Sequence, residues 1–258
     1  MVHLNKVSKT YDSGRHFAVK DVSLRVERGE FVVLLGESGC GKTSTLKMIN
    51  RLIEASSGTI TVAGRDITTI DPVLLRRSIG YVFQEVGLFP HLTVMENAAA
   101  VPRLLGWSKG SSRDKARELL EMVGLDPGQF GSRLPDKLSG GQRQRVGVAR
   151  ALAASPEVML MDEPFGALDP ITRSGLQLEF KKLQGDLKFT VLMVTHDMME
   201  ALTLADRIAV METGRIVACG APRDILRNPG HPYAEALLKS PKRQAEELSR
   251  LMRGDGAG

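Results

Sequence analysis

The chain has 258 residues, enough to bury a sizeable hydrophobic core in one large domain or two small ones. Its hydrophobic content of 42% and charged content of 25% are ordinary for a soluble globular protein. The net charge of +5 comes from 35 Lys and Arg residues that are spread along the chain. Because no basic block and no interleaving of basic with aromatic residues stands out, nucleic acid is not an expected partner.

The cysteines and the first residues bear on the compartment. Cys40 and Cys219 are the only cysteines, and neither has CxxC or zinc-ligand spacing, which predicts no disulfide and no structural metal. The opening MVHLNKVSKTYD lacks the apolar core of a signal peptide, and no apolar run approaches the length of a membrane span. We expect a soluble, intracellular protein; if it works in transport, another chain must cross the bilayer.

The elements expected in chain order alternate between strands and helices. Residues 2–10 and 17–26 alternate at period two around a turn at 12–14, as antiparallel strands do. Continuous apolar runs or helical spacing then predict, in order, a strand at 30–35, a helix from 42 to about 52, strands at 58–62 and 79–83, helices at 111–123 and 140–154, strands at 158–161 and 190–194, and a helix at 196–205. This alternation favours a parallel sheet that is covered by helices on both faces. A charged tail follows from Pro241, with a short helix expected at 245–252.

A glycine-rich segment, GESGCGKT, follows the strand at 30–35 and precedes a helix. Its glycines allow backbone N–H groups to turn inward around phosphates, while Lys42 supplies a charge to the β- and γ-phosphates and Thr43 a ligand for Mg²⁺. The alternative is a strand–helix turn that merely packs tightly. The candidate nucleotide-binding residues here are Gly36, Ser38, Gly39, Cys40, Gly41, Lys42, Thr43 and Ser44.

A second candidate lies at the end of the apolar strand at 158–161, where Asp162 and Glu163 follow. Asp162 can hold Mg²⁺ through water, because magnesium keeps most of its hydration shell. Glu163 is placed to polarise a water that attacks the γ-phosphate. The alternative is a pair of acidic residues that simply opens a helix.

A third segment, LSGGQ at 138–142, opens the helix expected at 140–154. A helix start with exposed amides and the positive end of the helix dipole is an anion site. The alternative for Ser139 is a plain helix cap. The candidate residues are Ser139, Gly140, Gly141 and Gln142.

These three segments in this order, with Gln84 between them and His196 after them, resemble the nucleotide-binding subunit of ATP-binding cassette (ABC) transporters, from about Val2 to about Leu238. The resemblance implies an α/β fold: a P-loop NTPase core whose parallel sheet is flanked by helices, an N-terminal antiparallel β subdomain and an inserted α-helical subdomain. It places the nucleotide-binding domain at 1–240, the helical subdomain at about 87–149 and a short tail at 241–258.

The resemblance also implies roles for single residues. Gln84 would contact Mg²⁺ and the attacking water, and His196 would contact the γ-phosphate. Tyr11 would stack on adenine, and Asp169 would couple two sites across a dimer. Considered alone, the glutamine is an ordinary surface residue, the histidine a satisfied polar residue, and the tyrosine a strand-end ring packed against the sheet.

The implied cofactors are ATP and Mg²⁺, and the implied catalytic unit is a head-to-tail dimer in which LSGGQ closes on the ATP of the opposite subunit. Transmembrane permease subunits would dock near Leu88-Phe89-Pro90, and a solute-binding protein would take part indirectly. The chain would be peripheral, on the cytoplasmic face of the inner or plasma membrane.

Four longer sequence segments indicate which group within the family this chain resembles. KMINRLIE, IGYVFQEVGLFPHLTV, EPFGALDP and VTHDMMEALTLADRIAVM look most like bacterial importer ATPases for glycine betaine, choline and related osmoprotectants. The alternatives are an ATPase for another small solute such as an amino acid, an export ATPase, and a non-transport ATPase that acts on ribosomes or DNA. Larger members carry paired cystathionine-β-synthase-type domains, which we expect to be lacking in a sequence that stops at Gly258.

Overall fold

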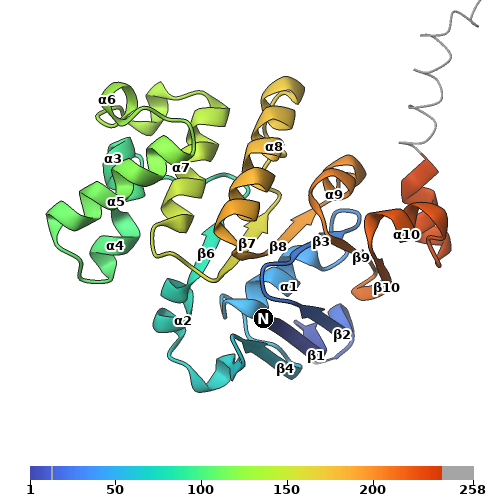
Figure 1. Cartoon of the computed structure of the whole chain (residues 1–258). Coiled ribbons are helices and arrows are strands. Elements are labelled where there is room, and N and C mark those ends of the chain that lie inside the picture. The colour runs from blue at the N-terminus through green and yellow to red at the C-terminus, as the bar shows by residue number, and fades with distance from the viewer. Residues whose placement is uncertain (13, 240–258) are drawn as a thin grey trace, which may run out of the picture.

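The computed structural model describes residues 1–12 and 14–239 (Figure 1). Residues 232–239 are helical, and short 3₁₀ turns lie at Ile67–Thr69 and Pro135–Lys137. The other elements are β1 (Val2–Thr10), β2 (Phe17–Val26), β3 (Phe31–Leu35), α1 (Lys42–Ile49), β4 (Ser57–Val62), β5 (Arg65–Asp66), α2 (Pro72–Ser78), β6 (Ile79–Val82), α3 (Val94–Ala98), α4 (Ala100–Leu104), α5 (Lys109–Met122), α6 (Pro127–Phe130), α7 (Gly140–Leu152), β7 (Val158–Asp162), α8 (Pro170–Leu187), β8 (Thr190–Thr195), α9 (Met198–Leu204), β9 (Arg207–Glu212), β10 (Arg215–Gly220) and α10 (Pro222–Arg227).

The strands form two sheets. The first, in the order β2-β1-β4-β5, is antiparallel throughout, which confirms the predicted N-terminal hairpin. The second has the order β10-β9-β3-β8-β7-β6; all its strands run parallel except β10, which pairs antiparallel with β9 at one edge. The predicted α/β fold with a parallel sheet is therefore confirmed, and the antiparallel edge strand is an addition that the sequence pattern did not indicate.

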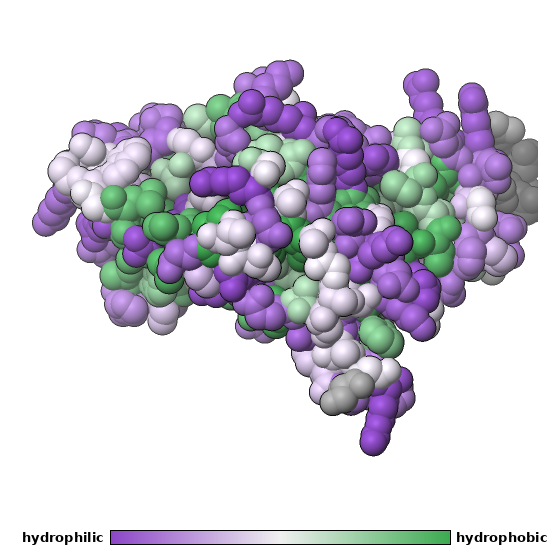
Figure 2. Space-filling view, turned by 90° about the horizontal axis from the view of Figure 1, so that it is seen from below, coloured by the Kyte–Doolittle hydropathy of each residue, from purple (hydrophilic) through white to green (hydrophobic). Residues whose placement is uncertain are grey.

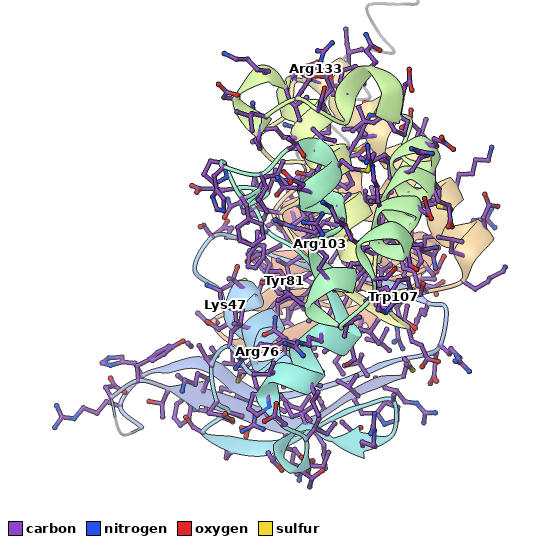
Figure 3. The ribbon with its side chains drawn as sticks, turned by 90° about the vertical axis from the view of Figure 1, so that its left-hand side faces the viewer. Lys47, Arg76, Tyr81, Arg103, Trp107 and Arg133 are labelled. Carbon is purple, nitrogen blue, oxygen red and sulfur yellow. The ribbon has the colours of Figure 1, made fainter. Side chains whose placement is uncertain are left out.

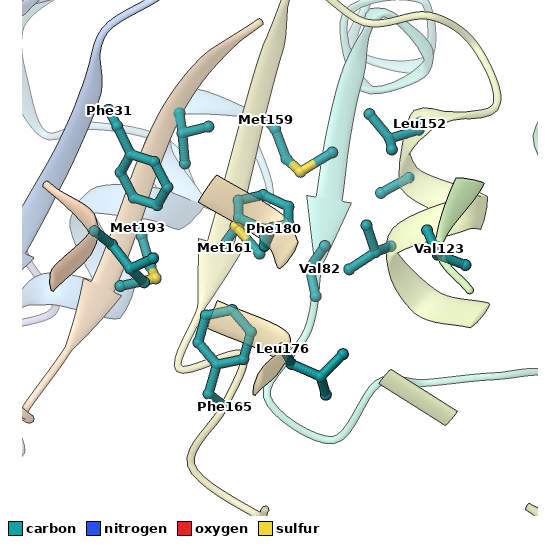
Figure 4. Close-up of a cluster of buried hydrophobic side chains, with 14 of the residues drawn as sticks. Phe31, Val82, Val123, Leu152, Met159, Met161, Phe165, Leu176, Phe180 and Met193 are labelled. Carbon is teal, nitrogen blue, oxygen red and sulfur yellow. The ribbon is translucent and has the colours of Figure 1, made fainter. Parts of the chain in front are cut away.

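The central strands β3, β7 and β8 are buried along their whole length, because helices cover both faces of the sheet. On one face Phe31, Met159 and Met161 pack with Phe165 and Phe180 (Figure 4), and the Phe31 and Phe180 rings meet edge to face at 6.0 Å. On the other face, the alternate residues of the same strands pack with α1 and the N-terminal sheet. The site residues that follow these strands therefore stand on a rigid base.

Helix ends differ from the predicted ones where local hydrogen bonds stop or start the helix. The helix expected to run to about Leu52 ends at Ile49, because Arg51 adopts a left-handed φ of 52° and the Leu52 N–H donates to the Lys47 carbonyl at 2.9 Å. The helix expected from His196 begins at Met198, because the Asp197 carboxylate caps it. His196 therefore lies on the strand–helix turn and outside the helix.

Helices α3 to α7 gather on one side of the sheet, at the left of Figure 1. Helix α7 ends at Leu152 rather than at Ala154, and it packs both on α3 and α5 and on strand β6. The division into a helical subdomain at 87–149 stays a prediction, and the helix predicted at 245–252 lies outside the described residues. Among the residues that the structure describes, no helix has the length and apolar character needed to cross a bilayer.

Candidate nucleotide site

The predicted site residues meet at one edge of the parallel sheet. Strands β3, β8, β7 and β6 are neighbours, and their carboxyl ends are level because Leu35 pairs with Thr195, Asp162 with Val194 and Val82 with Met161. The phosphate loop (residues 36–43), Glu163, His196 and Gln84 follow these four strand ends. Residues that are up to 160 positions apart in the chain are thus brought to the same edge, where ligands of open α/β sheets bind.

Two glycines of the phosphate loop are required by close packing against other segments. A Cβ on Gly36 would collide with the Met211 carbonyl of β9, and a Cβ on Gly41 would collide with the Ala18 carbonyl of β2. Gly41 also has φ +107°, a left-handed conformation that glycine adopts without strain. Gly39 has φ +82° with open space around it. The loop is therefore held from behind by two strands while its other side stays open.

Lys42 lies inside this loop. Its side chain is 4% exposed, and its ammonium group donates to the carbonyls of Gly36 at 2.7 Å and Glu37 at 2.8 Å. The neighbouring Cys40 is also buried, and burial raises the pKa of its thiol. Of the remaining candidates in the loop, Ser38 is exposed and Ser44 is half-buried in the first turn of α1. The loop thus holds one positive charge at its centre.

Thr43 and Asp162 form the predicted metal-binding pair. The Thr43 hydroxyl donates to the Asp162 carboxylate at 2.9 Å, which joins the phosphate loop to the end of β7. Burial raises the pKa of Asp162, and the Thr43 hydrogen bond and the charges of Lys47 and Lys42 oppose that rise. A hydroxyl and a carboxylate are the hard oxygen donors that Mg²⁺ prefers, so the two residues fit that ion.

Sequence reasoning missed Tyr81, which lies next to this pair. It pairs with Leu160 across β6 and β7, so its side chain is on the face that also carries Asp162. Its hydroxyl is buried; burial raises the pKa of Tyr81, and the Asp162 charge raises it further. Within the strand IGYVF the tyrosine is one apolar-face residue among others, so no local signal could have singled it out.

Glu163 contacts His196. The Glu163 carboxylate and the His196 Nδ1 are 3.0 Å apart, with the glutamate side chain 15% exposed and the histidine 59% exposed. Glu163 has a left-handed φ of 43°, and its N–H donates to the Val194 carbonyl at 3.0 Å. A non-glycine residue held in this region costs of the order of 1–3 kcal/mol, and such strain gathers at functional sites.

A buried polar network supports the turn that carries His196. The Thr195 hydroxyl donates to Glu200 at 2.6 Å, and the Gln177 amide of α8 donates to the other Glu200 oxygen at 3.1 Å. Glu200 is 3% exposed, and burial raises the pKa of its carboxyl. This network could not be predicted from sequence, because its members come from three separate elements, β8, α8 and α9.

Gln84 and Tyr11 lie on the surface around the site. Gln84 is exposed two residues beyond β6. Tyr11 follows β1, and its ring is 68% exposed with the Lys9 ammonium 5.0 Å from the ring centroid. Because the ring is so exposed, the sheet does not cover it. Tyr11 is at the end of the N-terminal sheet where Thr10 pairs with Phe17. Phe17 precedes Ala18, whose carbonyl would meet a Cβ on Gly41.

The LSGGQ segment makes its own hydrogen bonds at the start of α7. Ser139 and Gln142 cap each other: the Gln142 N–H donates to the Ser139 hydroxyl at 3.3 Å, and the Ser139 N–H donates to the Gln142 side-chain oxygen at 2.9 Å. A Cβ on Gly141 would lie 2.6 Å from the Thr172 methyl group of α8, and one on Gly140 would lie 3.4 Å from Leu168. The Ser139 cap that was the simpler alternative is therefore present, and the Gly141 position is needed for helix packing.

Asp169 lies beside that segment. It caps α8, accepting from the Thr172 N–H at 3.0 Å, and this hydrogen bond lowers the pKa of its carboxyl. The next-but-one residue, Ile171, is 87% exposed. Between residues 139–142 and 36–44, all of which are described, no hydrogen bond or ion pair forms.

Comparison with known proteins shows which family has this sequence. Residues 19–166 match the sequence profile of the ABC transporter family. Over 258 aligned residues the chain is 52% identical to the choline transport ATP-binding protein OpuBA of Bacillus subtilis, in a match that covers 98% of this chain and 67% of that protein. The chain belongs to the ABC transporter family.

Other members differ in length. The glycine betaine/carnitine/choline transport ATP-binding protein OpuCA of Bacillus subtilis is 54% identical over 92% of this ABC chain, which spans only 62% of that relative. The ATP-binding cassette MJ0796, solved as a dimer in a post-hydrolysis state bound to ADP and Pi, is 36% identical with a TM-score of 0.77, over 86% of this chain and 99% of that one. CbiO1 from Clostridium perfringens is 25% identical with a TM-score of 0.82, over 98% of each.

Proposed function

We propose that this chain is the ATP-hydrolysing subunit of a bacterial ABC importer. The observation that carries the proposal is the meeting of a buried loop lysine, the Thr43–Asp162 pair and the Glu163–His196 pair at one sheet edge. A glycine loop alone would support only phosphate binding. A carboxylate paired with an imidazole beside that loop adds the groups that activate a water for phosphoryl transfer.

Each residue has a distinct task in this proposal. The amides of residues 38–44 and the Lys42 ammonium bind the phosphates, and Lys42 exchanges its two carbonyl partners for phosphate oxygens. Thr43 and Asp162, with Gln84, would hold Mg²⁺, which supplies positive charge to the phosphates when bound. Glu163 accepts the proton of the attacking water, and His196 holds Glu163 in place and faces the γ-phosphate.

The LSGGQ segment and Asp169 serve the opposite subunit in this proposal. They form no polar contact with the chain's own phosphate loop, and they flank the exposed Ile171. The dimeric state of MJ0796 supports a head-to-tail dimer in which Ser139 and the two following glycines meet the partner's ATP.

The permease would dock on the face that Figure 3 shows, where Arg103, Trp107 and Arg133 lie. Phe89 is 43% exposed, and its N–H and carbonyl both bond the Asn97 side chain, which holds this residue at the surface. The neighbouring Leu88 is half-buried and packs against the main core. Figure 2 shows apolar side chains gathered at its left, on the side of α3–α5. Leu104, the last residue of α4, is 60% exposed. An apolar patch of this kind marks a protein interface.

A hollow of about 650 Å³ next to this patch adds charge. Its lining includes four cations, Arg103, Lys109, Arg113 and Arg117, and three acids, Glu96, Glu121 and Asp126. The hollow therefore offers charged side chains of both signs to a permease segment that packs on the apolar patch. The chain would then work as a peripheral subunit on the cytoplasmic face of the membrane.

The proposal for the transported solute rests only on the names of similar proteins. The two B. subtilis relatives bear names that include choline, and the YehX relative of Escherichia coli, 44% identical over 99% of this chain and 85% of its own length, is a glycine betaine uptake ATP-binding protein. We therefore propose a quaternary ammonium osmoprotectant, with another small solute as the second candidate. A role on ribosomes or DNA has no comparable support.

Transport itself provides the test. The chain would be reconstituted in proteoliposomes with an osmoprotectant permease and its solute-binding protein, and uptake of labelled glycine betaine and choline would be measured with ATP supplied on the chain's side. We expect ATP-dependent uptake that Glu163→Gln abolishes. Uptake that ignores this substitution would refute the ATPase role, and uptake of an unrelated solute alone would refute the osmoprotectant assignment.

A further inference from the structure

The last third of the described chain covers the back of the phosphate loop. The Gly214 N–H, in the turn between β9 and β10, donates to the Cys40 carbonyl at 2.9 Å. The Glu37 N–H donates to the hydroxyl of Tyr233 at 2.8 Å, a contact between residues 196 positions apart. The loop is therefore held from outside at both its beginning and its middle.

Tyr233 is itself firmly placed. It lies in the first turn of the helical residues 232–239, whose Ala234 and Leu238 are 0% and 1% exposed in the main core. Its N–H donates to Nδ1 of His231 at 3.3 Å, which fixes the start of this turn. Burial raises the pKa of Tyr233, so the group that meets Glu37 is a neutral hydroxyl at physiological pH.

Glu37 connects this tyrosine to the loop lysine. The same residue that donates its N–H to Tyr233 accepts the Lys42 ammonium on its carbonyl at 2.8 Å. When nucleotide enters, Lys42 has to leave that carbonyl for the phosphates. A loop that is fixed only by its own lysine would lose its shape at that moment, whereas a loop fixed from behind keeps it.

We propose that Tyr233 is a positioning residue for nucleotide binding, which holds the phosphate loop in its binding shape from the C-terminal side while Lys42 changes partners. The proposal rests on the proposed function, in that it takes the loop to be the ATP site. Its physical basis is preorganisation: a loop already in the bound shape spends less free energy on ordering when the ligand arrives.

The test removes the hydroxyl and keeps the ring. In the full chain, Tyr233→Phe should weaken ATP and ADP binding by roughly 2- to 10-fold, the range expected for one net hydrogen bond. Binding would be measured by titration calorimetry, and hydrogen exchange of the Glu37 amide by NMR should become faster. In steady-state hydrolysis the KM for ATP should rise while kcat stays close to that of the wild type, because the chemical groups are untouched.

Two further variants serve as controls for the result with Tyr233→Phe. Leu237→Ala removes core packing from the same helical segment and keeps the Tyr233 hydroxyl, so it should lower the melting temperature and leave nucleotide affinity unchanged. Equal loss of affinity in Leu237→Ala and Tyr233→Phe, or unchanged affinity in Tyr233→Phe, would overturn the role of the hydroxyl. Lys42→Ala separates the two proposals: it should reduce affinity by roughly tenfold or more, as for hydrogen bonds to a charged group. If Lys42→Ala binds normally, the loop is not the ATP site; if only Tyr233→Phe binds normally, the positioning role alone fails.

Discussion

The two glycine-rich segments of this chain differ in how far the rest of the fold surrounds them. The phosphate loop is enclosed: Lys42 is 4% exposed, Gly36 and Gly41 touch carbonyls of other strands, and Tyr233 and Gly214 bond the loop from behind. The LSGGQ segment satisfies its own helix start with a Ser139–Gln142 capping box, and beyond it lie the exposed residues around Asp169. Both are glycine-rich turns before a helix, yet only one is surrounded by the rest of the fold.

The difference indicates which contacts the chain makes for itself. Lys42 and Asp162 carry buried charges that bond within the chain, so this half of the site keeps its geometry before any ligand arrives. Ser139 has only a local cap partner, which is a small free-energy contribution of about 0.5–2 kcal/mol. A surface that is preformed but has no partner within its own chain is what a composite site between two subunits requires.

The largest expected effect concerns the enclosed half. Glu163→Gln removes the carboxylate that would accept the proton, so steady-state hydrolysis should fall by roughly two orders of magnitude or more, as expected for general-base removal. ATP binding should persist, since Lys42 and the loop are unchanged, and the protein should accumulate as an ATP-bound dimer. Phosphate release and gel filtration with ATP measure the two effects. Near-normal turnover in this variant would show that Glu163 is not the base.

The next prediction addresses the open half. Ser139→Arg replaces the small cap at the helix start with a bulky cation, which should abolish dimer closure and hydrolysis and leave ATP affinity of the monomer nearly intact. Affinity would be measured by equilibrium binding at a concentration where the chain is monomeric. If the monomer loses ATP binding, the LSGGQ segment belongs to its own chain's site and is not part of a site shared between subunits.

Mixing two variant chains tests directly whether one site combines the phosphate loop of one subunit with the LSGGQ segment of the other. Chains with Lys42→Ala and chains with Ser139→Arg should each be inactive alone. Their heterodimer contains one site with an intact phosphate loop and the partner's intact LSGGQ, and a second site in which both are broken. Some ATP occlusion should return on mixing, measured by retention of labelled ATP on filters. No gain over the separate chains would argue against a site shared between subunits.

Within the enclosed half, sequence predicted some of the residues and missed others. The phosphate loop, Asp162 and Glu163 follow apolar strands directly, so their place at one sheet edge could be predicted from pattern alone. Tyr81, Glu200 and Tyr233 could not, because each acts through a contact with an element distant in the chain. Helix ends were missed where a side-chain cap or a left-handed residue decides them, as at Asp197 and Arg51.

A smaller effect is expected at Tyr11, which follows β1 at the end of the N-terminal sheet. If the ring stacks on adenine, Tyr11→Ala should weaken nucleotide binding by about 1–2 kcal/mol, within the range for base–aromatic stacking. Tyr11→Phe keeps the ring and should be mild. The ring is 68% exposed, so neither change should alter folding, which circular dichroism would check. Equal losses in both variants would point to the hydroxyl and remove the stacking role.

The smallest expected effect concerns Glu200, and it tests whether burying its carboxylate lowers the free energy of unfolding. Burial raises the pKa of Glu200 above its ordinary value of 4.5, so above that pH the folded state holds its proton longer than the unfolded state does. Stability should therefore fall as pH rises through this window, since the folded form binds more protons. Glu200→Gln keeps an acceptor for Thr195 and cannot ionise, so urea unfolding from pH 4 to 8 should show a flatter dependence, with the variant gaining on the wild type toward pH 8. Glu235→Gln, at an exposed carboxylate, serves as the control and should follow the wild-type curve. Parallel curves for wild type and Glu200→Gln would mean that Thr195 and Gln177 fully compensate the buried charge.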